Sequence, residues 1–184
     1  MSALVVLTVL LAPARAEVGV SSDVSPWMLR GWSVIANVEP AATPKLRTSL
    51  EMWGMDFPDF AIALNAANAD EGWQRRVDVG VAPAVAWHPR KEGEGLHLGV
   101  MLNAMRSTVS RDGHAGEAHF WTVEAIPRVG FRWFPLRDKG LFVDPWLGPG
   151  LLAQVGLPDA IGGERYEEPL LQPLGTLHVG WRPR

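Results

Sequence analysis

Residues 121–134 have the sequence WTVEAIPRVGFRWF, in which alternate positions differ sharply in character. The odd-numbered positions are all apolar: Trp121, Val123, Ala125, Pro127, Val129, Phe131 and Trp133. The even-numbered positions include Thr122, Glu124, Arg128 and Arg132. Successive side chains of a β-strand point to opposite faces, so this pattern predicts a strand with one apolar and one charged face. The class of protein depends on which face points inward.

The same period of two recurs along the chain. Residues 76–88 set Val77, Val79, Val81 and Val85 against Asp78, Gly80, Ala82 and Ala84. Residues 96–105, 141–155 and 171–182 alternate similarly, and earlier segments do so more weakly, with residues 30–38 also fitting a short helix. We therefore expect an all-β, antiparallel up-and-down barrel of about eight strands. The expected strands are 17–22, 30–38, 45–54, 75–88, 95–108, 117–135, 141–155 and 170–182.

The connections between these strands alternate in length. Residues 39–44, 89–94 and 136–140 form short turns, whereas 55–74, 109–116 and 156–169 are longer. Outer-membrane barrels show this asymmetry, with tight periplasmic turns and longer external loops. In the 55–74 loop, Phe57, Phe60, Ala61 and Leu64 have helical spacing. We expect a short helix there, acting as a lid or as a ligand or partner site.

Tryptophans agree with this orientation. Trp87, Trp133 and Trp181 lie on apolar faces at strand ends that run toward the short turns, and Trp121 lies near the opposite rim. Indole favours the boundary between hydrocarbon and water, so these four residues are predicted membrane-interface aromatics. The alternative is that they fill the core of a soluble sandwich.

If the apolar faces meet lipid, the polar faces fill a narrow lumen. Small inward residues such as Gly80, Ala82 and Ala84 suit that limited space. His88, His97 and His178 are expected to form hydrogen bonds there. The charged side chains should neutralise one another and occlude the interior. The predicted luminal polar network comprises Arg47, Glu51, Asp78, Glu124, Arg128, Arg132, Asp144 and Arg182.

Length and composition set the remaining limits. A chain of 184 residues fits one domain, and its net charge of -3 gives no electrostatic reason to expect a nucleic-acid partner. Cysteine is absent, which excludes disulfides, thiolate catalysis and Cys-ligated zinc. Residues 3–12 are apolar and Ala14-Arg15-Ala16 has a small-x-small pattern, predicting a signal peptide at 1–16 and a mature barrel domain at 17–184.

The alternating strands, the turn asymmetry and the segment GFRWFPLRDKGLFVDPWLGPG (130–150) resemble small outer-membrane β-barrel proteins of Gram-negative bacteria. The resemblance covers most of residues 17–184 and is strongest after Arg75. It implies an outer-membrane location, with membrane lipid and the outer-membrane assembly machinery as partners, and it transfers no catalytic residue. Two features depart from the family pattern. Trp181 is followed by Arg182, Pro183 and Arg184 instead of ending the chain, and prolines fall within strands at Pro83, Pro127, Pro145, Pro149 and Pro173. Bulges are expected to accommodate the prolines.

Candidate chemical sites are few. The segment RDGHAGEAH contains the possible metal ligands Asp112, His114, Glu117 and His119, but its Asp-Gly favours a solvated hairpin loop. Glu164, Tyr166, Glu167 and Glu168 are likewise expected at a solvated loop tip. Ser107 or Ser110 with His97 or His114 is a possible hydrolase pair, although the His-x-Ser pattern of lipid-modifying barrels is missing. We therefore expect no catalytic, cofactor-binding or metal-binding residues.

These observations favour a structural, surface-interaction or small-ligand-binding barrel. Two alternatives stay open. One is a lipid hydrolase acting at the membrane rim. The other is a secreted soluble barrel that binds an apolar ligand in its centre.

Overall fold

The computed structural model describes residues 16–90, 93–136, 139–156 and 158–183. Apart from Ala16, the predicted signal peptide lies outside these residues. In the described part of the chain, neither helix has the length and apolar character needed to cross a membrane.

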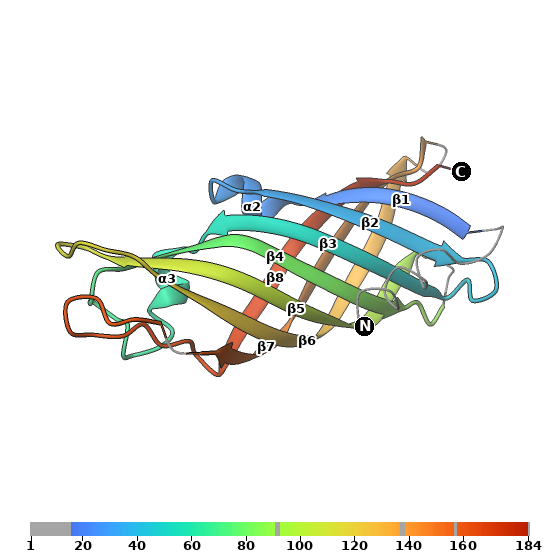
Figure 1. Cartoon of the computed structure of the whole chain (residues 1–184). Coiled ribbons are helices and arrows are strands. Elements are labelled where there is room, and N and C mark those ends of the chain that lie inside the picture. Colours follow the sequence, from blue (N-terminus) through green and yellow to red (C-terminus); the bar gives the residue numbers. More distant parts are fainter. Residues whose placement is uncertain (1–15, 91–92, 137–138, 157, 184) are drawn as a thin grey trace, which may run out of the picture.

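The described residues form eight antiparallel strands that close into one barrel (Figure 1). The strands are β1 (Ala16–Asp23), β2 (Trp32–Pro40), β3 (Leu46–Asp56), β4 (Trp73–Trp87), β5 (Gly95–Arg111), β6 (Ala118–Leu136), β7 (Leu141–Val155) and β8 (Leu171–Trp181). Each strand pairs with the next, and β8 closes the ring against β1, where Asp23 lies opposite His178. The predicted fold class is therefore confirmed, with strand boundaries close to those expected.

The two ends of the barrel differ as the sequence predicts. The turn end carries the connections 41–45, 88–94 and 137–140 together with the residues after β8. The loop end carries the connections 24–31, 57–72, 112–117 and 156–170, and it lies at the left of Figure 1. Helices α2 (Val24–Met28) and α3 (Asp59–Ile62) both belong to the loop end.

The two helices were predicted with unequal success. Helix α3 falls in the predicted loop, but it is a single turn that buries Ile62 and leaves Phe60 and Leu64 exposed. Of the four residues with helical spacing, Phe60 and Ala61 fall within α3, whereas Phe57 and Leu64 lie outside it. Helix α2 was not predicted, because its five residues are too few to show a period. It begins where Asp23 accepts a 2.8 Å hydrogen bond from the Ser25 amide.

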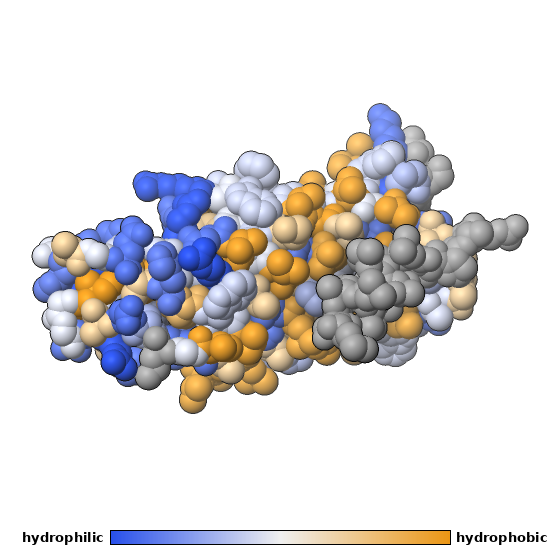
Figure 2. All heavy atoms as spheres, in the orientation of Figure 1, coloured by the Kyte–Doolittle hydropathy of each residue, from blue (hydrophilic) through white to orange (hydrophobic). Residues whose placement is uncertain are grey.

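The apolar face of the strands points outward. Leu147 on β7 is 63% exposed and Leu102 on β5 is 57% exposed, whereas Thr122 and Ser107 are fully buried. Figure 2 shows hydrophobic residues gathered over the middle of the barrel and hydrophilic residues at the loop end. A soluble barrel would have the reverse arrangement, with an apolar interior.

A bulge in β4 changes which residues face inward. Val77 pairs with Ser107 and Val79 pairs with Arg106, so two steps on β4 match one step on β5. Val77 is consequently buried, and Asp78 is half-buried and accepts a 2.8 Å hydrogen bond from Thr108. The predictions that Asp78 is luminal and that Val77 shares a face with Val79 were both wrong. They assumed that inward and outward residues alternate without interruption along β4, whereas the bulge between Val77 and Val79 interrupts this alternation.

The five strand prolines also differ from expectation. Pro83, Pro127, Pro145, Pro149 and Pro173 are all exposed on the outer face. The pairing register runs without a shift past Pro83 in the β3–β4 pair and past Pro127 in the β5–β6 pair. Within the described residues the register shifts lie elsewhere, so bulges are not what accommodates these prolines.

Small inward residues make room for large ones, as predicted. A Cβ atom at Gly80 would lie 2.5 Å from the Trp53 indole. At Gly150 a Cβ atom would lie 2.1 Å from the Glu124 carboxylate. Both distances are far below a van der Waals contact, so side chains from facing strands fill the interior of this narrow barrel.

Candidate functional site

At the turn end, polar side chains from five strands and from the residue after β8 form a network around Asp144. One Asp144 oxygen, Oδ2, accepts hydrogen bonds from Arg47 Nη1 at 2.6 Å and from Arg132 Nε at 3.2 Å. The other oxygen, Oδ1, lies 2.7 Å from His97 Nε2. We call the turn-end network the set Glu39, Arg47, His97, Arg132, Asp144 and Arg182.

A second carboxylate completes this network. Glu39 accepts a 2.8 Å hydrogen bond from Arg132 and pairs with Arg182. The guanidinium of Arg132 also lies 4.1 Å from the centre of the Phe142 ring. Next to the network, burial and the nearby Arg47 lower the pKa of His88 to about 4, which keeps its imidazole neutral at physiological pH.

At the loop end, Arg75 and Glu168 form a buried ion pair. Arg75 Nη2 lies 2.8 Å from Glu168 Oε1, and Arg75 Nη1 donates to Glu168 Oε2 at 3.0 Å. Arg75 also donates to Ser107 Oγ, and its guanidinium lies 4.2 Å from the Phe57 ring centre. Burial raises the pKa of Glu168, and Arg75 opposes that rise.

The 158–170 segment brings Glu168 into the barrel mouth. Tyr166 is buried in a cluster with Trp73 and Phe120, and burial raises its pKa to about 12. Asn68 fixes the segment through a 2.6 Å hydrogen bond to the Glu167 carbonyl. The prediction of a solvated tip was therefore wrong for Tyr166 and Glu168. We call Arg75, Tyr166 and Glu168, with the cluster around them, the loop-end plug.

Between the turn-end network and the loop-end plug lies a central cavity of about 100 Å³. Its wall includes the acidic residues Asp23, Glu51 and Glu124 and the aromatic residues Trp53 and Trp146. Glu124 accepts hydrogen bonds from Gln172 at 2.9 Å and Asn103 at 3.2 Å.

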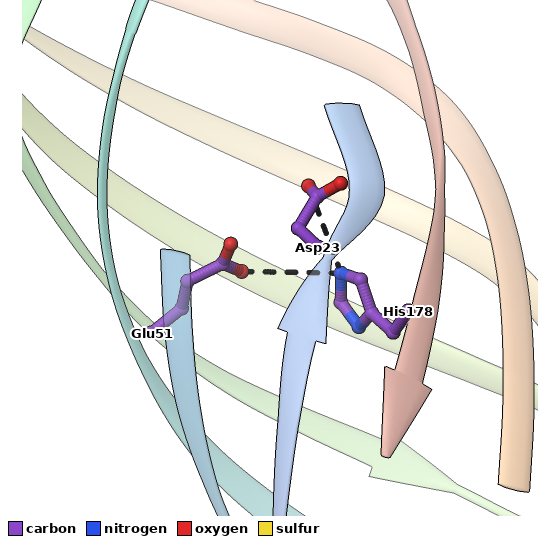
Figure 3. A group of neighbouring side chains, drawn as sticks. All are labelled: Asp23, Glu51 and His178. Carbon is purple, nitrogen blue, oxygen red and sulfur yellow. Dashed lines mark ion pairs between the residues drawn. The ribbon is translucent and has the colours of Figure 1, made fainter. Parts of the chain in front are cut away.

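Asp23 and Glu51 converge on His178 at the side of the central cavity (Figure 3). His178 Nε2 lies 4.0 Å from Asp23 Oδ2 and 4.0 Å from Glu51 Oε2. One potential ligand atom from each of the three residues lies within 4.8 Å of the others, and all three residues are buried. No metal-binding residue was predicted from the sequence. Among the described residues, this cluster is the one whose potential ligand atoms lie close enough together to hold a metal ion.

The structure places every predicted luminal residue inside the barrel except Asp78. Arg47, Arg132, Asp144 and Arg182 belong to the turn-end network, and Glu51 and Glu124 line the central cavity. Arg128 lies 5.3 Å from the centre of the Trp146 ring. Sequence reasoning missed four further interior charges, namely Asp23, Glu39, Arg75 and Glu168. The bulge in β4 places Arg75 on the inner face, whereas uninterrupted alternation predicts the outer face. Asp23 and Glu39 lie near the ends of strands whose sequences alternate only weakly.

The predicted interface tryptophans all lie on the outer face. Trp87, Trp133 and Trp181 are 46–55% exposed near the turn end, and Trp121 is 48% exposed toward the loop end. The indole of Trp181 donates a 2.8 Å hydrogen bond to the Lys139 carbonyl.

The structure does not bring Ser107 and His97 together. Ser107 is buried beneath Arg75 at the loop end, whereas His97 binds Asp144 near the opposite end of the same strand. In the 111–119 segment, Asp112, His114, Glu117 and His119 are exposed. This arrangement agrees with a solvated hairpin loop.

No protein-family model and no curated protein matches the sequence. Among solved structures, the chain is similar to the crystal structure of a major outer membrane protein from Thermus thermophilus. The TM-score is 0.51 at 12% identity, over 92% of this chain and 100% of that chain. A likeness at this identity concerns the fold, which is that of a small outer-membrane β-barrel.

The turn-end network yields a stability prediction. Asp144→Asn should lower the free energy of unfolding by about 3–5 kcal/mol, because two buried arginines lose their shared carboxylate. Arg47→Met in the Asp144→Asn background should recover part of that loss, which a double-mutant cycle from urea unfolding in detergent measures. As a control, Asp56→Asn removes a half-exposed pair with Arg76 and should cost about 0–1 kcal/mol. Equal losses at Asp144 and Asp56 would contradict this account.

Proposed function

We propose that this chain is an integral outer-membrane protein whose barrel spans the lipid and whose interior is closed. The observation that carries the proposal is the inverted distribution of side chains on a closed barrel. Large apolar residues face outward, while arginines and carboxylates are buried. In water that outer surface would be an apolar patch far larger than soluble proteins tolerate, whereas in lipid it is the expected surface.

The height of the apolar surface fits a bilayer. Trp121 and Trp133 are 12 positions apart on β6. At about 3.3 Å per residue and a tilt of about 40°, they are roughly 30 Å apart along the barrel axis. That length matches the hydrocarbon core of a bilayer, which is about 30 Å thick. Arg106, which pairs with Trp121, is also exposed and supports a boundary at this level.

A closed interior favours a structural or surface-interaction role over a diffusion pore. The turn-end network and the loop-end plug each block the lumen with buried side chains. The loops at the loop end would then be the part of the protein that meets other molecules. We propose a non-enzymatic role, because Ser107 and His97 lie at different ends of β5. Export through the predicted signal peptide and insertion by the assembly machinery are part of this proposal.

Membrane insertion can be tested with one substitution at two positions. Leu147→Arg puts a cation on the outer face near the middle of β7 and should cost about 2–4 kcal/mol of refolding stability in lipid vesicles. Leu170→Arg, at an 82% exposed position beyond the strands, should cost about 0–1 kcal/mol. The proposal fails if the two variants are equally stable in vesicles.

Closure of the lumen can be tested by conductance. The wild-type protein in planar bilayers should show no large, stable single-channel currents. The variant Arg75→Ser with Glu168→Gln loosens only the loop-end plug and should also stay closed, because the turn-end network blocks the lumen independently. Stable currents from the wild-type protein would contradict a closed barrel, and currents from the double variant alone would show that the turn-end network does not close it.

A further inference from the structure

We propose that Asp23, Glu51 and His178 form a binding site for a divalent transition-metal ion inside the barrel. The three side chains come from the end of β1, from β3 and from β8, and they point toward one another (Figure 3). One imidazole nitrogen and two carboxylates are the ligands that zinc, manganese and related ions accept in proteins.

The hydrogen bond from Trp146 determines the protonation of His178. The Trp146 indole donates its N–H to His178 Nε2 at 2.9 Å. Indole is a donor only, so Nε2 must be an unprotonated acceptor. His178 Nε2 therefore carries no hydrogen, and its lone pair, which accepts the indole N–H in this structure, becomes available to a metal ion once the indole is released.

Asp23 and Glu51 lack the ion-paired arginines that the carboxylates at the two ends of the barrel have. Asp144 is paired with Arg47, Glu39 with Arg132 and Glu168 with Arg75. Among the described residues, no Lys or Arg nitrogen comes within 4.0 Å of the Asp23 or Glu51 carboxylate. The donor atoms of two buried carboxylates and one imidazole thus lie within 4.8 Å of one another without an ion pair to Lys or Arg. Arg128 attracts Glu51 from beyond ion-pair distance. A metal ion among the three donor atoms would add a positive charge in direct contact with both carboxylates.

Glu51 is the residue that most directly indicates a bound ion. Its side chain is only 7% exposed, and its carboxylate forms no hydrogen bond with any described residue. It lines the central cavity, as does Asp23, so an ion at this point has space for water ligands as well. An isolated buried carboxylate is costly, and coordination to a metal is one of the arrangements that offset the cost.

Asp23 is held in place for binding. Its Oδ1 atom accepts hydrogen bonds from the Ser25 amide and the Thr176 hydroxyl, which leaves Oδ2 toward His178. Such supporting hydrogen bonds orient metal ligands. Ser25 and Pro26 of α2 also line the central cavity, next to Asp23. Coordination requires Nε2 to release the Trp146 indole and the three ligand atoms to move closer together.

The proposal is tested by titrating ZnCl₂ into the refolded full chain in detergent, using calorimetry, with MgCl₂ as the comparison. Glu51→Gln, Asp23→Asn and His178→Gln should each weaken zinc binding at least about 10-fold. Asn remains a good helix cap, so Asp23→Asn keeps α2 in place. Glu124→Gln removes a charge from the same cavity outside the cluster and should change the affinity less than about threefold. Trp146→Phe removes the competing donor and should tighten binding.

Several results would overturn this inference. Absence of zinc binding by the wild-type protein is one, and binding unaffected by Glu51→Gln, Asp23→Asn and His178→Gln is another, because the ion would then sit elsewhere. Equal losses in Glu51→Gln and Glu124→Gln would indicate general attraction of cations to an acidic cavity. Equal affinity for Mg²⁺ and Zn²⁺ would exclude a role for the imidazole. Folding of each variant is checked by the heat-dependent mobility of the barrel on gels, so the outcome does not depend on the proposed membrane function.

Discussion

The structure depends on neutralising charge inside a narrow barrel whose outer face is apolar. Once the large apolar residues are turned outward, the inward positions hold arginines and carboxylates that have little water around them. Each buried charge then needs a partner, since an unpaired one costs several kcal/mol (about 3–5 when one member of a pair is lost). Asp144 meets this need for two arginines from β3 and β6 and for His97 from β5. Strands distant in the sequence are thereby tied together across the interior.

The need to pair buried charges is met differently in different parts of the interior. At the turn end and the loop end, carboxylates and arginines occur together and close the lumen. In the centre, Glu124 is bound by amide side chains, while Asp23 and Glu51 face an unprotonated histidine nitrogen. The centre is therefore the region where Asp23 and Glu51 have no Lys or Arg within ion-pair distance, and it is where we propose that a cation binds.

Much of the fold was predictable from sequence, because period-two alternation is a local property. The pattern in β6 sets Glu124, Arg128 and Arg132 on one face, and the structure buries all three. The prediction failed at Asp78, where one extra residue in β4 shifts the parity, and this shift is visible only in the pairing with β5. Tyr166 and Glu168 lie in a connection whose sequence does not alternate, so nothing in the sequence indicated that their side chains are buried.

The candidate metal site was out of reach for a different reason. Asp23, Glu51 and His178 are far apart in the sequence and lie on three strands. Asp23 meets His178 only because β8 closes the ring against β1 in one particular register. The inward parity of Glu51 and His178 was visible in the sequence, but their proximity depends on barrel closure.

The central claim, that the apolar faces meet lipid, can be measured along β6 because the chain has no cysteine of its own. Single cysteines at Thr122, Val123, Ile126 and Phe131 would carry a spin label in protein refolded into vesicles. Oxygen, which concentrates in hydrocarbon, should reach the label at Val123 and Phe131 far better than at the buried Thr122 and Ile126. Reversed accessibility, or equal accessibility at all four positions, would contradict a barrel with its apolar face in the membrane.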